Sequence, residues 1–191
     1  IFIVFKIMNL LNICTKIILI SFFSFSIGFC DEKMNDFFDN NPEKRWIFFA
    51  DIVMGGKSSG KVVFRNQNGM NYAHLSGTVT TENNGGFIQI RKKISGLQSN
   101  VSNINIKVKG NNQIYHVFLR TSGTILPWQY YKVGFKAKNN WEKISIPISK
   151  FERSSNFLAK HIKVQNIKSI GLVAYGRNFN ADLYVTEVTF Q

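Results

Sequence analysis

Hydrophobic and polar side chains alternate with a period of two through most of this 191-residue sequence. Ile104, Ile106 and Val108, for example, are separated by Asn and Lys. A period of two places alternate residues on opposite faces of a β-sheet. Short runs of this type, separated by Gly, Asn and Ser, predict strands. The predicted strands span residues 46–50, 61–65, 71–79, 87–92, 103–109, 114–121, 130–137, 142–147, 169–175 and 183–190.

The order of these runs indicates the fold class. No run has the spacing of a strand–helix–strand unit, and the one stretch that could be helical is short and lies within 149–163. The last run changes phase between Val185 and Val188, which predicts a β-bulge. The pattern predicts an all-β fold, an antiparallel β-sandwich formed by a single domain over residues 46–191.

The first 45 residues differ in composition from the rest. Lys16 precedes fourteen uncharged, mostly apolar residues, 17–30, fewer than the roughly 20 of a membrane span and typical of a secretory signal. We expect residues 1–30 to be a signal peptide or, if translation starts at Ile1 rather than Met8, an N-terminal anchor, and 31–45 to be a polar linker. The protein is then exported (periplasmic or secreted) or membrane-anchored. A mitochondrial location is less favoured because the segment has no Arg.

The chain is basic, with 24 Lys and Arg against 11 Asp and Glu. Residues 31–191 keep 22 of these cations and all 11 acids, a net charge of +11. The longest basic run is Arg91-Lys92-Lys93, so we expect no nucleic-acid partner; an acidic partner or an anionic membrane surface fits better. Both cysteines precede residue 31, which excludes disulfides and thiol chemistry from the domain.

Two glycine-rich segments, 51–60 and 82–91, are the most specific local signals. Each contains a Gly-Gly pair, which allows positive φ, and each begins with an acidic residue, Asp51 or Glu82. We expect two loops at the same end of one sheet. Asp side chains fix tight turns through backbone amides, and Arg91 is expected to neutralise one of the two carboxylates in a bridge that holds the loops together.

Two other interpretations of these loops remain open. Asp51 and Glu82 could form a carboxylate pair as in a glycosidase, or could ligate calcium together with Asn83 and Asn84. The loop-clamp interpretation is favoured because turns of this composition are fixed by their own side chains.

The sequence contains no complete catalytic motif. Ser58 lies in Gly-Lys-Ser-Ser, but Gly55 is only two residues before Lys57 and a strand follows Gly60, so this is not a phosphate-binding loop. Ser58 is therefore counted among the loop-clamp candidates. The three histidines show no metal-ligand spacing. We expect no enzymatic activity, no metal and no cofactor.

Aromatic residues are numerous, and most are expected to pack in the core, Trp46 and Trp141 among them. Two others differ in their surroundings. Trp128 and Tyr130 follow a Ser-Gly-Thr turn and are expected near a loop tip, where exposed rings would suit sugar stacking or a protein contact. Packing over the sandwich edge is the alternative.

Together these residues resemble the complex I intermediate-associated protein 30 family. The family's first block is matched by Trp46, Asp51, Val53, Met54, Gly55, Gly56, Ser58 and Gly60, and its second by Gly77, Glu82–Phe87 and Arg91. Leu119-Arg120, Phe135, Trp141, Ile146-Pro147 and Ile170-Gly171-Leu172 keep the family's order. Asn111-Asn112-Gln113 departs from its usual Asp-Gly-Arg, which weakens any charge role there.

The resemblance implies a galactose-binding-like jelly-roll sandwich without catalytic residues. It implies a non-enzymatic factor that helps to assemble respiratory complex I by binding a protein partner; we expect a monomer. The alternative is an exported module that binds carbohydrate or another small ligand. The candidate binding or loop-clamp residues are Asp51, Ser58, Glu82, Asn83, Asn84, Arg91, Arg120, Trp128 and Tyr130.

Overall fold

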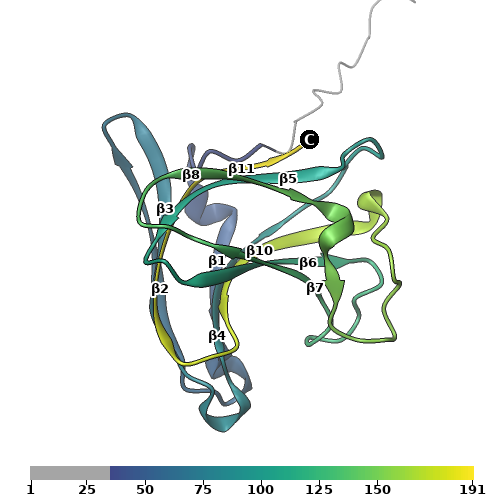
Figure 1. Cartoon of the computed structure of the whole chain (residues 1–191), viewed down its shortest axis with the longest axis horizontal. Helices are drawn as coiled ribbons and strands as arrows, with labels where there is room; N and C mark the ends of the chain where they lie inside the picture. Colours follow the sequence, from purple (N-terminus) through teal and green to yellow (C-terminus); the bar gives the residue numbers. More distant parts are fainter. Residues whose placement is uncertain (1–34) are drawn as a thin grey trace, which may run out of the picture. The chain divides into compact units, whose positions relative to one another are not determined.

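The computed structural model describes residues 35–191, so the expected signal peptide or anchor over 1–30 lies outside the described residues. The described chain forms two antiparallel sheets, of order β1-β4-β10-β6-β7-β9 and β2-β3-β11-β5-β8 (Figure 1). Among residues 35–191, no helix combines the length and the apolar character needed to cross a bilayer. The strands are β1 Trp46–Ala50, β2 Ser59–Gln67, β3 Met70–Val79, β4 Phe87–Lys93, β5 Asn103–Gly110, β6 Ile114–Thr121, β7 Tyr131–Lys136, β8 Glu142–Pro147, β9 Glu152–Arg153, β10 Ile167–Tyr175 and β11 Phe179–Phe190.

The inward faces of the two sheets share one hydrophobic core. Ile104, Ile106 and Val108 of β5 are fully buried, as their alternation predicts, and they belong to the same cluster as Ile88 and Ile90 of β4 in the other sheet. Full burial of a side chain of this size stabilises the fold by about 1.5–3 kcal/mol. The predicted antiparallel β-sandwich is confirmed.

The structure corrects some details of the predicted elements. The register of β11 against β5 shifts between Val185 and Glu187, which confirms the predicted bulge. The stretch that could be helical, within 149–163, contains only the end of a short 3-10 turn, η4 (Ile148–Lys150), which is followed by β9 and by turns. Trp141 was expected in the core. It is instead only half-buried, outside the core, with its ring edge against Tyr184.

The segment before Trp46 belongs to the folded body, and so differs from the linker expected over 31–45. Asp36 and Val188 of β11 exchange two backbone hydrogen bonds, of 2.8 and 2.9 Å. Phe38 is 3% exposed and stacks on Trp46, with 5.2 Å between the ring centroids. The buried ring and the bridge to β11 fix this segment on the sandwich, so the folded body begins ten residues upstream of the expected boundary.

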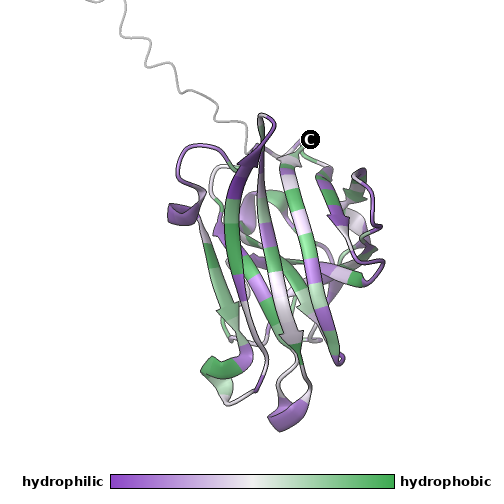
Figure 2. Cartoon of the chain, turned by 90° about the vertical axis from the view of Figure 1, so that its left-hand side faces the viewer, coloured by the Kyte–Doolittle hydropathy of each residue, from purple (hydrophilic) through white to green (hydrophobic). Residues whose placement is uncertain are grey.

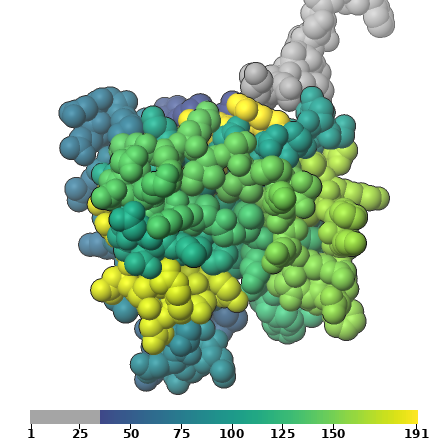
Figure 3. All heavy atoms as spheres, viewed as in Figure 1, coloured from purple at the N-terminus to yellow at the C-terminus, as the bar shows by residue number. Residues whose placement is uncertain are grey.

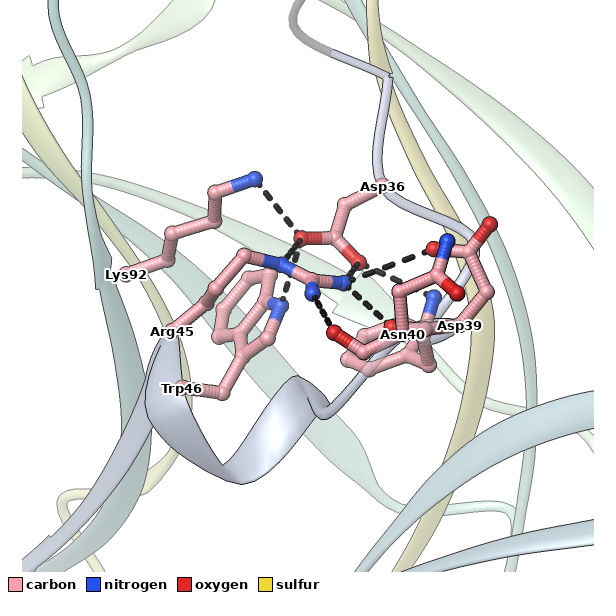
Figure 4. Close-up of polar contacts among 7 residues, drawn as sticks. Asp36, Asp39, Asn40, Arg45, Trp46 and Lys92 are labelled. Atoms are coloured by element: carbon pink, nitrogen blue, oxygen red, sulfur yellow. Dashed lines mark hydrogen bonds and ion pairs between the residues drawn. The ribbon is translucent and has the colours of Figure 1, made fainter.

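The carboxylate of Asp36 is the centre of a polar cluster at the junction of the two sheets (Figure 4). It accepts hydrogen bonds from the Arg45 guanidinium (3.1 and 3.2 Å), Lys92 Nζ (2.7 Å), Trp46 Nε1 (3.1 Å) and the Phe38 amide (2.9 Å). Burial alone would raise the pKa of Asp36, but these donors, Arg45 and Lys92 first, outweigh it and lower the pKa to about 2.

Candidate functional site

Both glycine-rich segments lie at one end of the sandwich, as predicted. The first forms the 3-10 turn η2 (Asp51–Met54) and the second forms η3 (Glu82–Asn84). Figure 2 shows both turns at the same end of the sheets, η2 largely hydrophobic and η3 hydrophilic. The β10–β11 turn packs beside them, since the Asn178 side chain accepts a hydrogen bond of 2.8 Å from the Thr81 amide; Figure 3 shows this turn in yellow against the blue loop segment.

The carboxylate of Asp51 joins the two loops. It is fully buried and accepts hydrogen bonds from the amide and hydroxyl of Ser58, at 2.9 and 2.6 Å, and from the amides of Gly86 and Phe87 in the second loop. A Cβ on Gly56 would overlap this carboxylate, so glycine is required for the close approach. Burial alone would raise the pKa of Asp51, but the hydrogen bonds from Ser58, Gly86 and Phe87 outweigh it and lower the pKa.

The predicted pairing of Arg91 with an acidic residue of the loops is wrong. The Arg91 guanidinium lies over the ring of Phe49, 4.3 Å from its centroid. Glu82 instead forms an exposed ion pair of 2.7 Å with Lys57. Asp51 is stabilised by N–H and O–H donors, and a buried carboxylate with several such donors needs no cation beside it.

The loop-clamp interpretation fits this geometry better than the glycosidase or calcium interpretations. The Asp51 carboxylate is fully buried and already accepts four hydrogen bonds, from Ser58, Gly86 and Phe87. The Asn83 amide donates to the Gly55 carbonyl at 3.3 Å, which ties η3 to η2. Within residues 35–191, no three His, Cys, Asp or Glu side chains gather as a metal site would require. The hydrogen bonds of Asp51 and Asn83 therefore join the two loops at this end of the sandwich.

A groove lies on the outward face of the six-stranded sheet. Its floor is made by side chains that alternate away from the core: Gln89 and Arg91 of β4, Phe118 and Arg120 of β6, and Tyr175 of β10. The cavity measures about 780 Å³, within the range of small-molecule and oligosaccharide-sized sites. The strands that carry it can be followed in Figure 1.

Gly171 leaves the middle of this floor open. The register of β10 places Gly171 between Arg91 of β4 and Phe118 of β6. A Cβ there would meet the flexible Gln89 side chain at 3.0 Å, and nothing closer. The backbone therefore tolerates a larger residue at this position, and the glycine serves to keep space above the sheet.

Stacked aromatic rings form one wall of the groove. Tyr130 stacks on Phe118, with 4.1 Å between the centroids and 8° between the planes. Tyr175 meets both rings edge-on, and its hydroxyl lies 3.1 Å from that of Tyr130. Burial and the hydrogen bond to Tyr175 raise the pKa of Tyr130, so the Tyr130 hydroxyl stays neutral. These rings present flat, uncharged faces beside polar donors.

Two loops with exposed apolar side chains form the rims. Val53 and Met54 of η2 are 75% and 58% exposed and line one side. Trp128, 63% exposed, lies opposite on the β6–β7 loop. Arg120 holds this loop in place, because its guanidinium donates to the carbonyls of Leu126 (2.8 Å) and Pro127 (2.9 Å). The rims are thus built from fixed turns.

The structure separates the predicted site residues into two groups. The groove collects five of them: Asn84, Arg91, Arg120, Trp128 and Tyr130. The loop clamp holds the other four: Asp51, Ser58, Glu82 and Asn83. The groove also contains residues that the sequence had not singled out as a site: Phe49, Phe87, Gln89, Phe118, Gly171 and Tyr175. The period-two pattern alone places aromatic and basic residues of β4 and β6 on the face away from the core, but only the strand order brings these residues together.

The fold and the open groove define a galactose-binding-like β-sandwich. The chain belongs to the complex I intermediate-associated protein 30 family, whose model matches residues 35–184. A search of curated protein sequences gave no match.

Among solved structures, the chain is similar to carbohydrate-binding modules. One is the family 11 module from Clostridium thermocellum in complex with a β-1,3-1,4-mixed-linked tetrasaccharide: the TM-score is 0.66 and the identity 17%, over 81% of this chain and 92% of that chain. Another is the family 11 module of a cellulosomal cellulase from Clostridium thermocellum, with a TM-score of 0.63 and 16% identity over 77% and 88%. At these low sequence identities, the structural similarity is evidence for the fold alone.

Proposed function

We propose that the protein is a non-enzymatic binding protein that holds a carbohydrate chain in the groove of its six-stranded sheet. The observation that carries this proposal is the groove itself, in which the stacked Phe118 and Tyr130 rings lie beside Gln89 and two arginines. Its support from outside the chain is the similar fold of a module solved with a bound tetrasaccharide.

The chemistry of the groove suits a sugar. Aromatic side chains offer a large apolar face at low entropic cost, on which the C–H face of a pyranose ring can stack. The Gln89 amide and the Arg91 guanidinium can form hydrogen bonds with hydroxyl groups. The fixed rims limit the ordering cost of binding, and an exported location would bring the groove into contact with extracellular glycans.

Two variants should remove binding without unfolding the protein. Trp128→Ala deletes an exposed ring from the rim, and Gly171→Val fills the floor with a residue that β-strands favour. We expect each to weaken binding by about tenfold or more. A glycan array selects the ligand for the full-length protein and calorimetry measures its affinity. Phe157→Ala is the matched control, since Phe157 is 93% exposed and lines no part of the groove.

The outcomes separate clearly. An array that gives no signal for the wild type would refute the proposed function. Binding that survives both Trp128→Ala and Gly171→Val, with unchanged thermal unfolding, would place the ligand elsewhere on the domain.

A second candidate is a role in the assembly of respiratory complex I, which membership of the family supports. The exposed apolar side chains of Ile52, Val53 and Met54 favour it, because clustered apolar groups at a surface mark protein contacts. Crosslinking in the native cell tests it: recovery of membrane subunits of complex I would support this role, and their loss in an Ile52→Ser, Met54→Ser variant would place the contact on η2.

A further inference from the structure

A second hollow continues the groove at its open end. It measures about 530 Å³ and shares Arg91, Arg120 and Ser169 with the aromatic groove. Beyond these it is lined by Lys93 and Lys168, by Ile94, and by the hydroxyl-bearing residues Ser95, Thr121 and Thr124. The two hollows therefore form one continuous depression, aromatic at one end and basic at the other.

The charge of the basic end is not balanced by the protein. Arg91, Lys93, Arg120 and Lys168 all line it. In the part of the chain that the structure describes, no Asp or Glu lines either hollow, and the ion pairs of the described residues involve other lysines, Arg45 and His74. Four cations facing one concave surface create a strong positive potential there.

The guanidinium of Arg91 has N–H donors that are not used within the described residues. This guanidinium is half-buried and lies over the Phe49 ring, and within residues 35–191 it forms no hydrogen bond or ion pair with another residue. Burial lowers the pKa of Arg91, and burial together with the positive charge of Arg91 lowers that of Arg120, yet arginine stays charged in proteins. A partly desolvated guanidinium with free N–H groups is matched best by a bidentate oxyanion.

We propose that the basic end of the groove is an oxyanion subsite, and that the carbohydrate held by the protein carries carboxylate or sulfate groups. This inference rests on the proposed function and narrows its ligand to an acidic glycan. Arg91 forms the bidentate contact, and Lys93 and Lys168 supply the surrounding positive potential. The sugar ring preceding the acidic group stacks on the aromatic end.

A pair of probes that differ only in charge tests the assignment. Tetragalacturonate and its fully methyl-esterified form have the same backbone, and a sulfated galactan tetrasaccharide distinguishes the two anions. For the full-length protein we expect at least tenfold tighter binding of tetragalacturonate than of its ester, or of the sulfated galactan tetrasaccharide than of its unsulfated form. Raising the salt concentration should weaken the binding of the anionic probe and leave the binding of the ester unchanged.

Arg91→Gln locates the subsite. It should reduce the affinity for the anionic probe by about tenfold or more, and leave the ester within about twofold. Arg65→Gln is the matched control, because Arg65 is an exposed arginine on β2 of the other sheet and its loss changes the net charge equally. A reduction in Arg91→Gln alone supports the subsite, and an equal reduction in both variants overturns it.

The failure of this inference differs from failure of the proposed function. Neutral glycans that bind the groove as tightly as the anionic ones would overturn the oxyanion subsite and leave the carbohydrate groove intact. An array without any glycan signal would overturn both. Binding of a polyglutamate peptide, but of no glycan, would assign the basic end to a protein partner and overturn the acidic glycan.

Discussion

Replacing Asp51 with Ala should lower the free energy of unfolding by about 3–5 kcal/mol, the range of a lost buried charge with its hydrogen-bond network. The substitution leaves the hydroxyl and amide of Ser58 and the amides of Gly86 and Phe87 without their acceptor. Each buried donor left unpaired costs about 1–3 kcal/mol. Urea unfolding of the wild type and the variant at neutral pH measures the difference.

Glu82→Ala is the control for this result, because it removes an acidic residue from the partner loop. Its ion pair with Lys57 is exposed, with side chains 61% and 58% accessible, and exposed pairs contribute about 0–1 kcal/mol. We therefore expect a change below about 1 kcal/mol. If the two variants lose similar stability, then Asp51 is not the clamp between the loops.

The clamp also shows what the sequence could and could not predict. Two diglycine segments, each led by an acid, predicted two turns that meet at one end of the sandwich, and the structure brings them together. The partner of the carboxylate was predicted as Arg91, because charge complementarity is readable in a sequence. Backbone amides were also predicted as partners of the Asp51 side chain within its own turn, but the amides of Gly86 and Phe87 belong to the other loop. Every residue but proline carries an amide, so residue types could not reveal which amides of the second loop meet the carboxylate.

The strands were predictable because their alternation is local, whereas the groove depends on register. Arg91, Gly171 and Phe118 meet only because β10 lies between β4 and β6. That order joins strands far apart in the chain, and no local pattern specifies it. Trp128 and Tyr130 could be singled out as a platform beforehand, but the Phe118 ring beneath Tyr130 required the pairing of β6 with β7.

The beginning of the domain was misjudged for a related reason. Residues 31–45 are polar and rich in Asn and Asp, a composition typical of linkers. Asp36 nevertheless lies buried because Lys92 and Arg45, together with Trp46, surround it with donors. A buried carboxylate with this many partners becomes structural, and the acidity that suggested solvent exposure instead fixes the segment.

The stability of the protein should therefore depend on Asp36 in acid. Its pKa is lowered from 3.8 to about 2 in the folded state, so its contribution is fully present above about pH 4 and is lost as the pH falls toward and below 2. The shift corresponds to about 2.5 kcal/mol. In Asp36→Asn this contribution is absent at every pH. Its stability deficit relative to the wild type should consequently be largest near pH 6.

Urea unfolding of both proteins between pH 6 and pH 2 measures this dependence, and other carboxylates cancel because the two proteins share them. The difference in unfolding free energy should shrink by about 2 kcal/mol by pH 2, because most of the loss falls between the pKa of 3.8 in the unfolded chain and the pKa of about 2 in the folded protein. Asp39→Asn, which removes an exposed carboxylate 3.6 Å from the same Arg45, should cost less than about 1 kcal/mol at pH 6. If the stability deficit of Asp36→Asn stays constant down to pH 2, then the carboxylate is not held ionised by Arg45 and Lys92. The N-terminal segment would in that case owe its position to the Phe38 ring and the backbone bridge to Val188 alone.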